Sequence, residues 1–82
     1  MLNANYILVC CDGDGREVFV RRDGKTRYQF YSCKTATVAM RKALECISGV
    51  QCTKLYRRHR TGGYRWVATR FRDGAHLSTW GE

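Results

Sequence analysis

Short apolar runs separated by Asp-Gly turns dominate the first part of the chain. Asn5–Cys11 is rich in strand-forming residues, Arg16–Arg22 alternates apolar and polar positions, and Thr26–Ser32 carries three aromatic residues. The runs are separated by Asp12–Gly15 and by Asp23–Gly24. Asp-Gly pairs between such runs are typical of tight turns between antiparallel strands. The pattern predicts three short antiparallel strands.

The spacing of apolar residues then changes to that of a helix. From Thr35 to Ser48 they recur three and four positions apart, which places them on one helical face. They are Ala36, Ala39, Met40, Ala43, Leu44 and Ile47. The oxygen that caps the first turn is expected from Ser32, Thr35 or Thr37, and Gly49 suits a left-handed residue at the end.

Two further strand-like runs follow the helix. Gln51–Arg60 and Tyr64–Arg72 are joined by Thr61-Gly62-Gly63, and Ala75–Trp80 is a short tail that docks on the fold or adds an edge strand. The predicted order is βββαββ. This order indicates one small α+β domain over residues 1–82, with one antiparallel sheet and a single helix packed on one face.

Length and composition agree with a small domain. The chain has 82 residues, is 44% hydrophobic and carries a formal net charge of +8. It lacks the glycine fingerprints of nucleotide-binding folds, and no apolar run approaches the roughly 18 residues that a membrane span needs.

The cysteine pattern gives no disulfide framework or metal site. Five cysteines, two of them the adjacent Cys10 and Cys11, cannot all pair within one chain. No pair has the spacing that zinc sites use. We expect free thiols, no metal or cofactor, and a reducing cytoplasmic location.

The positive charge is concentrated in one predicted hairpin. Between residues 54 and 72 lie seven Lys and Arg residues and no Asp or Glu, with aromatic residues interleaved. Arginine binds phosphate in a bidentate manner, and aromatic rings stack on exposed bases. The sequence therefore predicts a contact surface for nucleic acid or an acidic partner, made of Lys54, Tyr56, Arg57, Arg58, Arg60, Tyr64, Arg65, Trp66, Arg70 and Arg72.

The hairpin register decides which of these side chains share a face. A three-residue turn places Leu55, Val67 and Phe71 toward the helix. The opposite face then carries Tyr56, Arg58, Arg60, Tyr64, Trp66 and Arg70. A two-residue turn would mix the two sets, because a slip of one residue reverses the faces. Two alternatives stay open, namely a solvated basic edge that prevents strand pairing and a core role for Tyr56 and Trp66.

One alternative is enzymatic. His59 lies among arginines and could act in acid–base catalysis, as histidines do in small basic ribonuclease toxins. No toxin motif surrounds it, so the prediction is a protein that is not an enzyme.

The segment Cys33–Trp80 resembles the small anti-CRISPR proteins of phages and mobile elements, namely the inhibitors of type I systems. The resemblance rests on an alanine-rich helix, a Gly49 stop, a basic strand, a tight hairpin, the aromatic strand Tyr64–Ala68 and a terminal Trp80. It implies a protein that docks on an RNA-guided CRISPR surveillance complex, in the host cytoplasm, and blocks target DNA binding. The other expected partner is nucleic acid itself, bound by a stand-alone module; no membrane partner is expected.

Overall fold

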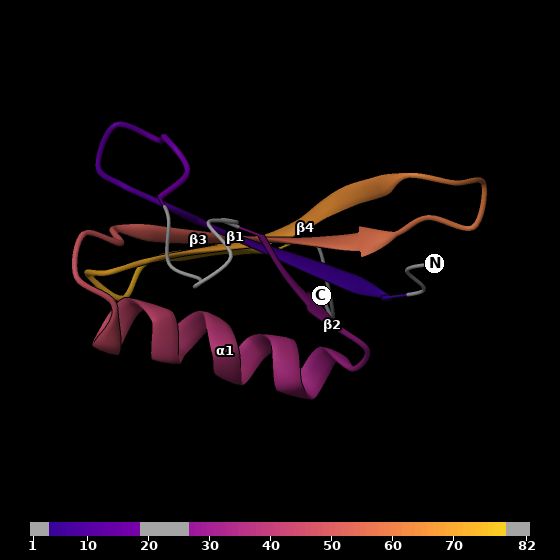
Figure 1. Cartoon of the computed structure of the whole chain (residues 1–82), viewed down its shortest axis with the longest axis horizontal. Coiled ribbons are helices and arrows are strands. Elements are labelled where there is room, and N and C mark those ends of the chain that lie inside the picture. Colours follow the sequence, from indigo (N-terminus) through magenta and orange to yellow (C-terminus); the bar gives the residue numbers. More distant parts are fainter. Residues whose placement is uncertain (1–3, 19–26, 79–82) are drawn as a thin grey trace.

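The computed structural model describes residues 4–18 and 27–78. Within them the chain forms five strands and one helix, arranged in two layers (Figure 1). The elements are β1 (Tyr6–Cys11), β2 (Arg27–Phe30), α1 (Cys33–Cys46), β3 (Cys52–Arg58), β4 (Tyr64–Phe71) and β5 (His76–Ser78).

All neighbouring strands are antiparallel, in the order β2-β1-β3-β4-β5. The first strand therefore lies between β2 and β3 rather than at the start of a meander. The predicted class, one antiparallel five-stranded sheet with a single helix on one face, is confirmed. Within the described residues the order of the elements is ββαβββ, compared with the predicted βββαββ.

The difference arises from the segment Arg16–Arg22, which was expected to form a strand. Residues 19–22 lie outside the described residues, and in the described part only Glu17 forms an isolated bridge, to Cys11. The fifth strand is instead β5, so the tail adds an edge strand. The other strands are slightly shorter than predicted.

The helix begins at Cys33, two residues earlier than predicted. Ser32 is its N-cap, and the Ser32 hydroxyl accepts a hydrogen bond from the Thr35 N–H at 3.2 Å. The last helical residue is Cys46, with Ile47 as C-cap, so Gly49 lies two positions beyond the cap. Gly49 does have the left-handed backbone expected of it, with φ 89°.

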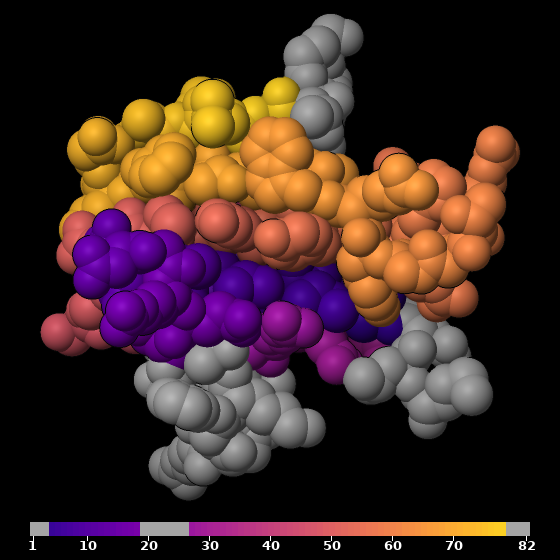
Figure 2. All heavy atoms as spheres, turned by 90° about the horizontal axis from the view of Figure 1, so that it is seen from above, coloured from indigo at the N-terminus to yellow at the C-terminus, as the bar shows by residue number. Residues whose placement is uncertain are grey.

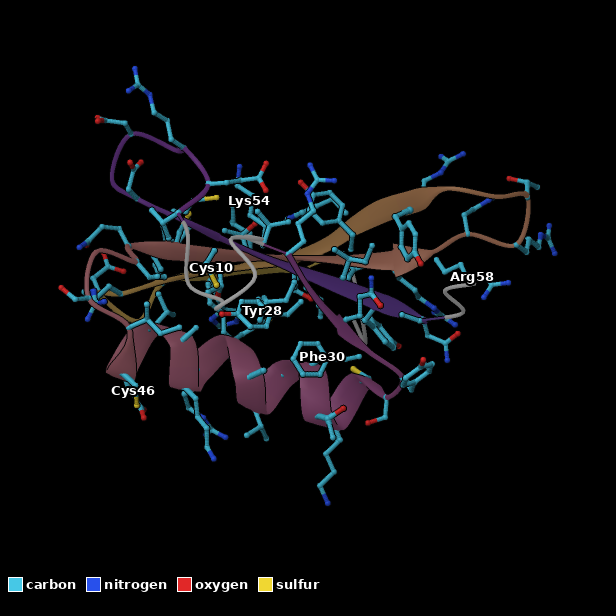
Figure 3. All side chains as sticks on the ribbon, viewed as in Figure 1. Cys10, Tyr28, Phe30, Cys46, Lys54 and Arg58 are labelled. Atoms are coloured by element: carbon cyan, nitrogen blue, oxygen red, sulfur yellow. The ribbon has the colours of Figure 1, made fainter. Side chains whose placement is uncertain are left out.

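The main core lies between α1 and the sheet. Ala36, Met40, Ala43 and Leu44 of the helix, all predicted to face inward, pack against Leu8 and Leu55 of the central strands. Tyr28 and Phe30 point from β2 toward the helix (Figure 3). These contacts hold one face of the sheet against the helix, and a smaller buried cluster of Val9, Cys11 and Cys52 lies on the other face.

The molecule has two distinct ends along the strand direction. At the hairpin end, the β3–β4 loop (residues 59–63) projects beyond the start of α1, close to the start of β1 (Figure 1). At the loop end, the segment 12–18 and the end of α1 lie together with the β4–β5 turn.

Candidate nucleic-acid interface

The sheet face opposite α1, here called the open face, has no described helix or strand packed on it, and Val9, Cys11 and Cys52 form a small buried cluster there. Apart from segment 12–18 at the loop end, no described segment lies on it (Figure 2). The strand registers place on this open face Ile7, Val9 and Cys11 from β1, Cys52, Lys54, Tyr56 and Arg58 from β3, and Tyr64 and Trp66 from β4. A side chain labelled in Figure 3, Lys54, points away from the helix.

A β-bulge sets the composition of this face. The β3–β4 register shifts between Leu55 and Tyr56: Leu55 pairs with Ala68, whereas Tyr56 pairs with Trp66. Val67 is therefore the extra residue, and both Val67 and Ala68 are buried in the core beneath α1. Because one residue is inserted, the side chains on either side of it change phase.

Because of the bulge, two residues lie on the opposite face of the sheet from the one predicted from the sequence. Phe71, expected in the core, pairs with Cys52 and lies on the open face, where it is 38% exposed. Arg70, expected on the open face, pairs with Thr53 and lies on the helix side. Leu55 and Val67 face the helix as predicted, and Tyr56, Arg58, Tyr64 and Trp66 share the other face as predicted.

The turn has the predicted length, three residues, but lies one position earlier. His59 and Gly63 close it, with the His59 N–H donating to the Gly63 carbonyl at 2.9 Å and the Gly62 N–H donating to the His59 carbonyl at 3.0 Å. The turn within the loop is thus Arg60-Thr61-Gly62, and Gly62 has a φ of 105° that favours glycine.

Two aromatic side chains on the open face are held by their polar atoms. Trp66 donates from Nε1 to Thr69 Oγ1 at 2.7 Å, and Tyr64 donates from its hydroxyl to the Ala4 carbonyl at 2.8 Å. The bulge makes the first bond possible, because Trp66 and Thr69 would otherwise lie on opposite faces. Each side chain is still 37% exposed. Because these polar atoms already form hydrogen bonds, the part of each side chain that is exposed to solvent is mainly its aromatic ring.

A groove of about 350 Å³ crosses the open face beside these rings. It runs over β1 and β3 and is lined by Ile7, Val9, Tyr56 and Tyr64, among others. Lys54 and Arg27 line it too. One carboxylate, Glu17, also reaches the groove and forms an ion pair with Arg27, 3.2 Å from Arg27 Nε to Oε1. This hydrogen bond is the main cause that raises the pKa of Arg27.

Sequence reasoning missed several residues of this face. Ile7, Val9 and Arg27 belong to strands far from the basic hairpin and enter only through the sheet order. The bulge itself has a visible signal, since adjacent apolar residues at Val67 and Ala68 interrupt the alternation of β4. Phe71 could have been placed from that signal.

Arg72, predicted as a contact residue, has a structural role in the fold. Its Nε donates to the Val50 carbonyl at 2.9 Å, and its Nη2 donates to the Ile47 carbonyl at 3.1 Å. Both carbonyls follow the end of α1, where free carbonyl groups carry partial negative charge. Arg72 therefore fastens the helix end to β4.

His59 is also committed to local structure. Its Nδ1 accepts a hydrogen bond from the Thr61 N–H at 3.2 Å and lies 2.6 Å from Thr61 Oγ1. These contacts order the hairpin loop.

The five cysteines are free, as expected. Burial raises the pKa of Cys10 to about 11, and burial together with the neighbouring Cys52 raises that of Cys11 to about 11. In residues 4–18 and 27–78, no three His, Cys, Asp or Glu side chains are grouped as a metal site requires.

None of the described helices has the length and apolar character needed to cross a membrane. Comparison with protein-family models, with curated proteins and with solved structures found no match to this chain. The arguments about function therefore rest on the residues of the site.

Proposed function

We propose that this protein is not an enzyme but a nucleic-acid-binding protein that holds a single strand on the open face of its sheet. One observation carries the proposal: Tyr64 and Trp66 are fastened by their polar atoms yet exposed, beside Lys54 and Arg58 on the same face. Exposed rings fixed on a sheet stack on bases, and adjacent cations track the phosphate backbone.

Several features support a single strand over a duplex. A sheet face with exposed rings and a groove beside them matches unstacked bases, whose faces are available for stacking. Base pairs in a duplex hide these faces. The face contributes few hydrogen-bonding groups besides the cations, so we expect weak sequence preference and strong salt dependence.

The test measures fluorescence anisotropy of a labelled 12-nucleotide single strand, as RNA and as DNA, with a duplex of the same sequence for comparison. Trp66→Ala should weaken binding by about tenfold or more, because one stacked base contributes about 1–3 kcal/mol. Trp66→Phe keeps a ring and should restore most of the affinity. Equal affinity of Trp66→Ala and the wild type would overturn the stacking platform.

A charge-reversal pair tests the cations. Lys54→Glu with Arg58→Glu should abolish binding, whereas the matched pair Arg41→Glu with Lys42→Glu, both exposed on α1, should change it little. If both double variants weakened binding equally, the strand would be attracted by the net charge of the protein alone.

A second candidate is the inhibitor of an RNA-guided surveillance complex that the resemblance implies. It is supported by the order of helix, stop, basic strand and aromatic strand, present here as α1, Gly49, β3 and β4. The assay measures target DNA binding by a guide-loaded complex with the protein added. Inhibition without affinity for free strands would favour this candidate over the stand-alone module.

A further inference from the structure

A pocket of about 620 Å³ lies at the hairpin end, on the helix side of the sheet. It exists because the β3–β4 hairpin projects past the start of α1, so the sheet there has no helix beneath it (Figure 1). Val67 and the adjacent strand residues border it on the sheet, and Cys33 lies at the helix side.

Four arginines and no carboxylate line this pocket: Arg57, Arg58, Arg60 and Arg65. Their guanidinium groups form no hydrogen bond or ion pair with any residue in the described ranges. Figure 3 shows Arg58 at this end of the molecule. The five described carboxylate residues lie at the loop end: Asp12, Asp14, Glu17, Glu45 and Asp73.

The strand register places two of these cations directly beside each other. Arg57 pairs with Arg65 across β3 and β4, and Tyr6 pairs with Arg57 on the other side. Like charges opposite each other in a sheet are destabilising. The fold keeps this pair without a counter-charge from the described residues, which is the arrangement expected where a bound anion supplies it.

Other groups at the pocket also suit an anion. The start of α1 contributes the partial positive charge of a helix N-terminus, and its first turn has no acidic residue. Tyr6 adds a hydroxyl, and its pKa is raised by burial and by Cys33 and lowered by Arg57.

We propose that this pocket binds a phosphate group, held by Arg57 and Arg65 as the floor and by Arg58 and Arg60 at the rim. Paired guanidinium groups bind the oxygens of a phosphate in bidentate fashion, which a monovalent anion such as chloride cannot match. The phosphate is either free inorganic phosphate or the terminal phosphate of a nucleic-acid strand. Arg57 and Arg65 lie on the opposite face from Trp66, so the floor of the pocket is separate from the proposed stacking platform, and Arg58 borders both.

The first arm titrates inorganic phosphate at constant ionic strength, with chloride as the balancing salt, and follows the Arg Nε–H signals by NMR. The signals of Arg57 and Arg65 should shift and saturate together, while that of Arg41 on α1 should not. Arg57→Gln with Arg65→Gln should weaken phosphate binding at least about tenfold, and Arg41→Gln should leave it unchanged. The proposed phosphate site would be contradicted if the double variant still bound phosphate saturably. It would also be contradicted if chloride produced the same shifts of the Arg57 and Arg65 signals.

The second arm distinguishes the two sources. A 5′-phosphorylated six-nucleotide strand is compared with the same strand lacking the phosphate. Tighter binding of the phosphorylated strand, lost in Arg57→Gln with Arg65→Gln, assigns the pocket to a strand end. Equal binding of the two strands, with saturable inorganic phosphate binding, assigns it to free phosphate.

The proposed stacking of strands on the open face and the proposed phosphate binding in the pocket can be contradicted independently. Trp66→Ala should weaken strand binding but leave the inorganic phosphate titration unchanged. If strands stack on the open face and phosphate does not saturate the arginines, only the pocket is overturned.

Discussion

The arginines at the two ends of the sheet differ in how they are partnered. At the loop end, Arg72 donates to backbone carbonyls after α1 and Arg27 pairs with Glu17. At the hairpin end, Arg57 and Arg65 lie side by side with no such partner among the described residues. The same residue type therefore stabilises the fold at one end and is available for ligands at the other. The comparison predicts opposite effects of mutation on stability.

The largest effect is expected from Arg72→Ala. It removes the hydrogen bonds of a charged donor to the Ile47 and Val50 carbonyls, which should lower the free energy of unfolding by about 2 kcal/mol. The melting temperature should fall by roughly 4–8 °C per kcal/mol for a protein of this size. Thermal unfolding followed by circular dichroism measures it, with Arg60→Ala in the hairpin loop as the control. A melting temperature equal to that of the wild type would remove the structural role given to Arg72.

A second test uses the buried thiols Cys10 and Cys11. The pKa of each is raised from 9.0 to about 11, chiefly by burial, so the fold favours the protonated form. Their contribution is fully present below about pH 9 and is lost as the pH rises toward 11, because the unfolded chain loses its protons first.

We expect the free energy of unfolding to decrease by at least about 1–2 kcal/mol over this interval. Urea titrations at pH 8 and pH 10.5 measure the difference. Replacing Cys10 and Cys11 by valine should make the decrease smaller, since the unfolded chain then loses two titrating groups. An equal decrease in the variant would assign the pH dependence to the tyrosines and lysines instead.

A third test concerns the buried hydroxyl of Thr53, a residue that is fully buried between β1 and β4. Its Oγ1 has no hydrogen-bond partner in the part of the chain that the structure describes. Thr53→Val replaces the hydroxyl by a methyl group of similar size, so stability should rise by about 1 kcal/mol. Chemical denaturation measures it; a loss of stability would indicate that the hydroxyl has a partner after all.

The sequence predicted the helix and the basic hairpin well because both depend on local spacing. The helix, with Ala36 and Met40 inward, and the basic hairpin both follow from periodicity and turn residues. The neighbours of β1 could not be predicted in this way, because strand order depends on long-range packing.

The candidate site was predicted only in part for the same reason. Tyr64 and Trp66 were placed on the correct face, but the bulge at Val67 moved Phe71 and Arg70 to faces opposite those expected. Arg72 and Arg65 look alike in the sequence, both within the basic hairpin. The fold distinguishes them: Arg72 reaches the carbonyl groups after α1, whereas Arg65 lines the pocket at the hairpin end.

The smallest expected effect has the opposite sign and lies at the hairpin end. Arg65→Thr removes one charge of the Arg57–Arg65 pair and introduces a residue with high strand propensity. Stability should therefore rise by about 0.5 kcal/mol at low ionic strength, because repulsion between cross-strand like charges is relieved.

Salt provides the control for this last change. Screening reduces the repulsion in the wild type, so the gain should shrink as sodium chloride is raised from about 0.01 M to 1 M, where the Debye length falls from about 30 Å to 3 Å. Phosphate, by contrast, should stabilise the wild type more than Arg65→Thr, since ligand binding to the folded state adds to its stability. A variant that is less stable than the wild type at low salt would contradict the difference between the two ends, because Arg65 would then stabilise the fold as Arg72 does.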